Sequence, residues 1–210
     1  LIADLKNWHY EIEMIIVDCG SSDNTLAIAK SCSTKTLYVD HPNRGLQMDL
    51  GSKKSSGKWL LFLHADSRLP EGWVEKVYKR IKYSSSLETA WFFNLKINKK
   101  NFLLRVLELF VYLRSNILKR PYGDQGLLIS KELYKKVGGF KPICLMEDLD
   151  IIERISKKNK IKSLGTFIIT SGRRWENSNA IKQSIKNALL RWRWRQGDSS
   201  YSLHKEYYKK

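Results

Sequence analysis

The chain has 210 residues, of which 42% are hydrophobic and 28% are charged, and its net charge is +17. This size and balance fit one globular domain with a sizeable core, and they exclude a disordered tail or a membrane-spanning bundle. The positive charge indicates either a lysine-rich solvated surface or attraction to the phosphates of a nucleotide, an anionic lipid surface or a nucleic acid.

Short apolar runs rich in β-branched or aromatic residues predict strands, and apolar residues at helical spacing predict helices. In chain order we expect helix 1–8, strand 13–18, helix 25–31, strand 36–39, helix 44–55, strand 59–63, helix 71–81, strand 89–97, helix 102–118, strand 126–129, a helix ending at Val137, helix 148–156, strand 161–169 and helix 179–195. Strands that alternate with helices favour an α/β fold with a mostly parallel central sheet and helices on both faces.

Two of the predicted strands end on acids. The run "IIVD" ends at Asp18, and the run "LLFLHAD" ends at Asp66. Ligands of such sheets bind beyond the carboxyl ends of the strands, so both carboxylates are expected to face a ligand crevice. The Gly-Ser loop that follows Asp18 lets backbone N–H groups approach a ligand, and an ordinary helix-capping loop at Asp23 is the alternative.

Five blocks that occur in order resemble one known family. They are "IIVDCGSSDNT", "NRGLQMDLGSKKSSGKWLLFLHADSRLPEGW", "GDQGLLISKELYKKVGGF", "MEDLDIIERI" and "SGRRW". Together they are similar to the family 2 glycosyltransferases of the GT-A fold, in particular to a bacterial subgroup with HAD, GDQG, ED and RRW blocks. The resemblance implies a single GT-A domain over residues 1–210 that lacks the family's first N-terminal strand, with a basic Trp- and Arg-rich helix and tail at residues 179–210.

The resemblance also implies a reaction, the inverting transfer of a sugar from a nucleotide-diphosphate sugar to an acceptor hydroxyl, assisted by Mn²⁺ or Mg²⁺. Asp66 would hold the metal, because hard cations prefer oxygen ligands, and substrate phosphates would supply further oxygen ligands. His64 stands where the family usually has an Asp, and it would contact the ribose or sugar or else be structural. Asp148 would be the base that deprotonates the acceptor, with Glu147 beside it. Plain charge complementarity at a helix N-terminus is the alternative for these two acids.

The other implied residues would bind the substrates. Asp18 would hold the nucleoside, and the guanidinium groups of Arg173 and Arg174 would engage the diphosphate. The full set implied for substrate binding is Asp18, Ser21, Asp23, Arg44, Gln47, His64, Asp124, Gln125, Arg173, Arg174 and Trp175. A simple turn at residues 123–126 and an exposed basic loop at residues 171–175 are the alternatives.

Two segments leave the partners open. The apolar helix 102–118 could pack in the core, form a homodimer or lie on a membrane surface, and core or dimer packing is favoured. The tail interleaves Arg with Trp, which suits an anionic lipid surface and superficially resembles a nucleic-acid patch. Because no RNA-binding motif accompanies the tail, we expect no nucleic-acid partner.

The location and the competing functions follow from the same features. Three cysteines without CxxC spacing, and no apolar stretch of about 18 residues, predict a cytoplasmic protein. The Arg- and Trp-rich tail would allow peripheral contact at the inner face of the membrane. A nucleotidyltransferase on a similar fold, or a non-catalytic basic protein that binds membranes or RNA, stays open as an alternative.

Overall fold

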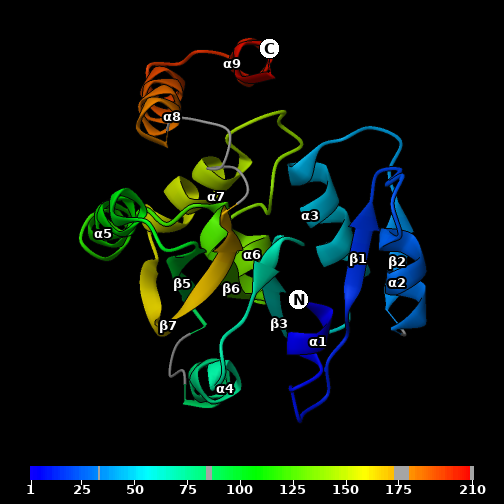
Figure 1. The fold of residues 1–210 in the computed structure, drawn as a ribbon. Helices are drawn as coiled ribbons and strands as arrows, with labels where there is room; N and C mark the ends of the chain where they lie inside the picture. The colour runs from blue at the N-terminus through cyan, green and yellow to red at the C-terminus, as the bar shows by residue number, and fades with distance from the viewer. Residues whose placement is uncertain (33, 84–86, 173–179, 209–210) are drawn as a thin grey trace.

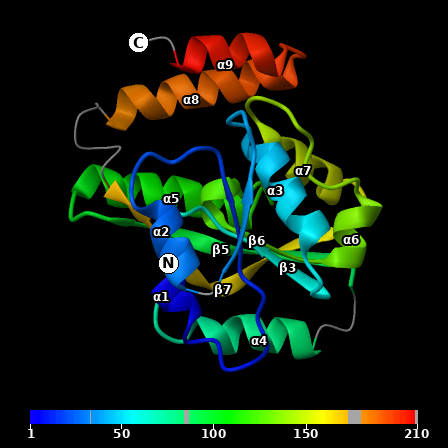
Figure 2. The same cartoon turned by 90° about the vertical axis from the view of Figure 1, so that its right-hand side faces the viewer.

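A computed structural model describes residues 1–32, 34–83, 87–172 and 180–208, and Figures 1 and 2 show its ribbon from two directions. The helices are α1 (Ile2–Leu5), α2 (Thr25–Ser31), α3 (Arg44–Lys54), α4 (Trp73–Tyr83), α5 (Phe102–Asn116), the 3₁₀ turn η1 (Gly123–Gln125), α6 (Lys131–Lys136), α7 (Glu147–Ser156), α8 (Ala180–Arg195) and α9 (Ser200–Tyr208). The strands are β1 (Ile15–Asp18), β2 (Lys35–Tyr38), β3 (Trp59–Phe62), β4 (Ser67–Arg68), β5 (Thr89–Asn98), β6 (Leu127–Ser130) and β7 (Lys160–Ser171). Each predicted element has a counterpart, whereas β4, η1 and α9 were not predicted.

Within the described ranges the strands form two sheets. β1 and β2 pair in parallel, and the main sheet has the spatial order β3-β6-β5-β7-β4. In the main sheet β5 and β7 are parallel, whereas β3 and β6, β5 and β6, and β4 and β7 are antiparallel. The expected mostly parallel central sheet is therefore wrong: the main sheet is mixed and mostly antiparallel.

Helix α5 explains one of the antiparallel pairs. A helix between two strands produces a parallel pair only when it carries the chain back to the starting end of the first strand. α5 ends beside the middle of β5, where the Asn116 side-chain amide donates to Asn94 Oδ1 at 3.0 Å. The chain then enters β6 from the middle of β5, with Trp91 opposite Leu128, and runs in the opposite direction.

The first five residues of β5, 89–93, are buried, so this part of the strand is covered on both faces of the sheet. Ala90 and Phe92 point to a core cluster shared with α6 and α7. Trp91 and Phe93 point to the other face, where Trp73 of α4 packs against them in a second cluster. Helices thus cover both faces of the main sheet, as expected from the sequence.

The two C-terminal helices pack together over the N-terminal end of α7 (Figures 1 and 2). Leu190 of α8 and Leu203 of α9 are buried in a third cluster with Leu145, Met146 and Leu149. Among the described residues, no helix combines the length and the apolar character that crossing a bilayer requires.

Candidate active site

The HAD, GDQG and ED blocks of the sequence meet at Gly123, the first residue of η1. The backbone N–H of Gly123 donates to Asp148 Oδ2 at 2.8 Å. A Cβ atom added at Gly123 would lie 3.0 Å from Nε2 of His64 and 3.3 Å from Cβ of Asp148. A side chain at position 123 would therefore push against His64 and Asp148, which both lie close to this turn.

Asp148 is held by a second backbone donor as well. The N–H of Leu149 donates to Asp148 Oδ1 at 2.8 Å. Helix α7 begins after Met146, a buried residue whose φ of 70° lies in the left-handed region that non-glycine residues rarely adopt. The start of α7 is therefore a constrained segment that fixes the carboxylate of Asp148 in one orientation.

Glu147 and Arg44 form an ion pair beside Asp148. Arg44 is the first residue of α3, and its Nε lies 2.9 Å from Glu147 Oε1. Glu147 is buried, and Oε2 of its carboxyl has no hydrogen-bond partner among the described residues. Burial raises the pKa of Glu147 to about 7, the negative charge of Asp148 adds to that rise, and Arg44 opposes it. Glu147 therefore titrates near neutral pH.

His64 is a partly buried histidine surrounded by charges. Burial lowers the pKa of His64, and the positive charge of Arg44 lowers it further. Asp124, Asp148 and Asp66 act in the opposite direction, which places these three carboxylates within electrostatic reach of the imidazole. This lowered pKa favours the neutral imidazole, which can donate one hydrogen bond and accept another.

Asp66, which follows β3, fits a divalent cation whose ligands come partly from the protein and partly from a substrate. Asp66 is exposed just before β4, and its carboxylate offers the oxygen atoms that Mn²⁺ and Mg²⁺ prefer. The described residues include no group of three or more His, Cys, Asp or Glu side chains arranged to hold an ion. One or two carboxylates are usual where substrate phosphates and waters complete the coordination.

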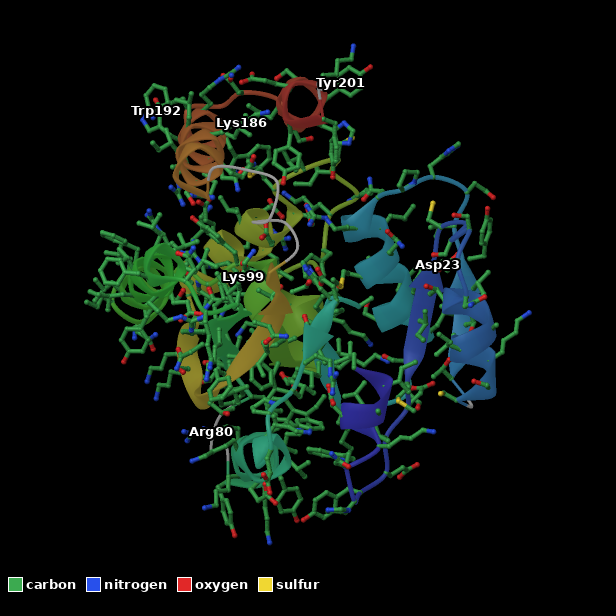
Figure 3. The ribbon with its side chains drawn as sticks, in the orientation of Figure 1. Asp23, Arg80, Lys99, Lys186, Trp192 and Tyr201 are labelled. Carbon is green, nitrogen blue, oxygen red and sulfur yellow. The ribbon has the colours of Figure 1, made fainter. Side chains whose placement is uncertain are left out.

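The residues predicted to bind the nucleoside lie at the end of β1. Asp18 is buried and accepts from Ser21 N–H at 2.9 Å and from the Ser21 hydroxyl, and these bonds, the hydroxyl first, lower the pKa of Asp18. Gln47 of α3 donates to the carbonyl of Val17 at 2.8 Å. Asp23, labelled in Figure 3, is exposed and accepts from the N–H of Thr25 at 3.0 Å. Each of these side chains thus makes at least one bond inside the protein.

Gln125 of η1 lies in the interior, away from any surface. Its side-chain oxygen accepts from the Ser115 hydroxyl at 2.7 Å and from Arg114 Nη2 at 3.0 Å. Its side-chain nitrogen donates to the carbonyl of Phe93 at 3.0 Å, and the residue has 0% exposure. The structure therefore places Gln125 as a brace between η1, α5 and β5, and leaves Asp124 on the partly exposed side of the turn.

A cavity of about 120 Å³ opens beside Asp148 and includes residues that the sequence did not single out. Its lining residues come from α3, α7, α8, α9 and the residues just before η1 and α7. They are Arg44, Tyr122, Leu145, Met146, Asp148, Leu149, Asn187, Leu190, Arg191 and Tyr207. Two guanidinium groups lie against the Tyr122 ring, that of Arg114 at 3.5 Å and that of Arg191 at 5.0 Å from its centroid. The only signals in the sequence were the position of Tyr122 next to the GDQG block and that of Arg191 in the Arg/Trp run.

The predicted phosphate-binding residues Arg173, Arg174 and Trp175 lie outside the described residues.

Solved structures show which class of fold this is. The chain is similar to residues 1–349 of S. aureus TarS, with a TM-score of 0.65 and 15% identity over 82% of this chain and 56% of that chain. It is also similar to the mannosyltransferase PcManGT from Pyrobaculum calidifontis, solved with GDP-Man and Mn²⁺, with a TM-score of 0.64 and 14% identity over 99% of this chain and 64% of that chain. The fold is therefore that of the GT-A glycosyltransferases.

The family follows from the sequence comparison. The model of "Glycosyl transferase family 2" matches residues 1–127, which is more than half of the chain, so the chain belongs to this family. Among curated proteins it is similar to glycosyltransferase GlyA of Streptococcus pneumoniae serotype 4 (strain ATCC BAA-334 / TIGR4), at 26% identity over 102 residues. That match spans 46% of this chain and 15% of the curated relative.

Proposed function

We propose that this protein is an inverting glycosyltransferase that moves a sugar from a nucleotide-diphosphate sugar to an acceptor hydroxyl. The observation that carries the proposal is the meeting of His64, Gly123 and Asp148, with two backbone N–H groups holding the carboxylate at the edge of a cavity. Asp148 is the one acid among the described residues that line this cavity. PcManGT, solved with GDP-Man and Mn²⁺, and TarS, solved with UDP-GlcNAc, support a nucleotide-sugar donor.

Asp148 is the proposed general base. As the acceptor oxygen forms its bond to the anomeric carbon, the hydroxyl proton passes to Asp148 and the bond from that carbon to the diphosphate breaks. The electron pair leaves with the diphosphate, and attack from the opposite face inverts the anomeric carbon. The two N–H groups that orient Asp148 lower the entropic cost of positioning the base against the acceptor hydroxyl.

Asp66 would hold Mn²⁺ or Mg²⁺ together with the donor phosphates, and the ion would supply charge neutralisation for the departing diphosphate. On the donor side, Asp18, Ser21, Asp23, Arg44 and Gln47 form the proposed nucleotide-binding edge at the end of β1 and the start of α3. His64 and Asp124 are proposed to face the donor sugar, while Arg173, Arg174 and Trp175 are proposed to contact the diphosphate. Gln125 acts indirectly, by bracing η1.

The cavity beside Asp148 is the proposed acceptor site. Asn187 and Arg191 of α8 and Tyr207 of α9 form one wall, and Asp148 forms the opposite side. Because the proposed base reaches this cavity, an acceptor bound there would present its hydroxyl to Asp148. Glu147 is proposed to assist by holding Arg44 at the rim.

The metal role is tested by replacing Asp66. Titration calorimetry with UDP and with GDP, each with and without Mn²⁺, measures nucleotide affinity and its dependence on the metal. We expect Asp66→Ala to lower the affinity in Mn²⁺ by at least about tenfold and to leave the metal-free affinity nearly unchanged, because Asp66 would hold the ion and the ion would supply charge neutralisation for the diphosphate. Glu132→Gln, which changes an exposed acid on α6, is the matched control. An unchanged affinity of Asp66→Ala in Mn²⁺ would contradict the metal role.

The base is tested by Asp148→Asn, with water as a substitute acceptor. Slow hydrolysis of UDP-GlcNAc, UDP-glucose or GDP-mannose reports turnover, and NMR of the first sugar released reports its anomeric configuration. We expect Asp148→Asn to bind nucleotide normally and to lose about 10²- to 10⁴-fold in turnover, because the amide cannot accept the proton. Turnover close to that of the wild type would assign the base elsewhere, and a product with the donor's configuration would rule out inversion.

A further inference from the structure

Helix α5 carries apolar residues on two opposite faces. Leu104 and Val111 are buried on the face turned to β5. The exposed apolar residues that share the opposite face at helical spacing are Phe102, Leu109, Phe110, Leu113 and the following Ile117. Phe102 is 80% exposed and Phe110 is 65% exposed. A surface helix normally has one apolar stripe, which faces the core, and α5 has a second one that faces outward.

Helix α8 has a similar outer stripe. Ile185, Leu189 and Trp192 are exposed at positions i, i+4 and i+7, whereas Leu190 is buried toward α7. α5 and α8 lie along the same side of the molecule in Figure 1 and run across the view, one above the other, in Figure 2. Figure 3 shows Trp192 pointing outward on that side. We call these two stripes, with their eight residues, the α5–α8 face.

The two segments that carry the α5–α8 face have an excess of cations, although Arg193 and Arg195 of α8 pair with acids outside these segments, at Asp198, Glu206 and Glu153. Residues 96–120 contain seven Lys and Arg residues and one acid, Glu108, and residues 180–195 contain five Lys and Arg residues and no acid. Glu108 is already engaged, since it accepts from the N–H of Ile97 at 2.6 Å and pairs with Arg105 at 2.6 Å. An apolar stripe bordered by cations matches the interior and the headgroups of an anionic bilayer.

We propose that the α5–α8 face docks on the surface of an anionic lipid bilayer. The apolar stripes would enter the headgroup region, Trp192 would sit at the interface, and the flanking Lys and Arg side chains would meet lipid phosphates. A second copy of the chain fits this face less well, because two-fold pairing would place two basic segments against each other. The proposal of docking on lipid does not rest on the proposed catalytic activity.

Vesicle flotation of the full chain tests the proposal. We expect binding to phosphatidylcholine vesicles in which about a third of the lipid is phosphatidylglycerol, and much weaker binding to pure phosphatidylcholine. The double substitution Phe110→Ser with Ile117→Ser should lower the partition coefficient by at least about tenfold, because two side chains that enter the interface are removed. Lys100→Glu with Lys119→Glu should reduce the preference for the anionic vesicles.

Ile28→Ser is the control, because Ile28 is also an exposed apolar residue and belongs to α2, which lies on the opposite side of the molecule in Figure 1. It should float like the wild type, and circular dichroism should show that every variant is folded. Equal binding to both kinds of vesicle, or full binding by the double Ser variant, would overturn the proposal. The proposal would also be overturned if the wild type did not float and sedimented as a dimer while the double Ser variant sedimented as a monomer. In that case the face would bind a second copy of the chain.

Discussion

At the scale of single residues, Glu147 stands out because a buried acid is usually either paired at both oxygens or neutral. One of its oxygens faces Arg44, and the other has no hydrogen-bond partner in the described part of the protein. Its pKa is raised to about 7, chiefly by burial, from 4.5 in the unfolded chain. The carboxyl therefore favours the folded state fully below pH 4.5, and this contribution is lost as the pH rises through about 7.

This linkage predicts a measurable change in Glu147→Gln. Urea unfolding at pH 5 and pH 8 gives the free energy of unfolding at both ends of the titration. We expect the wild type to lose about 1 to 3 kcal/mol more than Glu147→Gln between the two pH values, because the amide has no charge to bury. Glu153→Gln, which changes a more exposed acid of the same helix, should keep the wild-type pH dependence. Identical pH profiles for wild type and Glu147→Gln would contradict the assignment.

At the scale of elements, the turn η1 positions the candidate site although it is only three residues long. Its first residue, Gly123, donates to Asp148, and its last residue, Gln125, is hydrogen-bonded to α5 and β5. The bonds of Gln125 therefore set the position from which Gly123 reaches Asp148. The GDQG block combines a structural brace and a contact with the proposed base.

Gln125→Leu should weaken this element strongly. The substitution leaves the Ser115 hydroxyl and the Phe93 carbonyl buried without their partner, and we expect a loss of about 2 to 4 kcal/mol in the free energy of unfolding. Gln196→Leu, at an exposed position, should change stability by no more than about 0.5 kcal/mol. Urea denaturation of both variants provides the measurement, and equal stabilities would show that Gln125 is not a brace.

At the scale of the whole molecule, local patterns predicted where the elements lie but not how they pair. The apolar runs at β1, β3 and β5 and the capped start of α3 at Asn43 are local features, so they could be read from the sequence. The direction of β6 depends on where α5 ends against β5, which no local pattern encodes. Helix α9 was not predicted, and its buried residue, Leu203, packs against residues of α8 and of the start of α7, a contact that no local pattern encodes.

The candidate site divides in the same way. The acids at strand and helix ends, Asp66 and Asp148, carry local signals that the sequence exposes. Tyr122, Asn187 and Tyr207 reach the cavity only because the C-terminal helices fold back over α7, so their positions required the three-dimensional structure. Gln125 shows the opposite case, a residue in a recognisable block whose side chain turned out to be wholly interior.

Helix α8 has two sides with different neighbours. Asn187 and Arg191 line the cavity beside Asp148, while Ile185, Leu189 and Trp192 face outward. A surface that bound the outward side of α8 would also set the position and tilt of the cavity wall that the other side of this helix forms. Turnover would then follow the density of acceptor in the plane of that surface rather than its concentration in bulk water, as in interfacial enzymes whose substrates are confined to two dimensions.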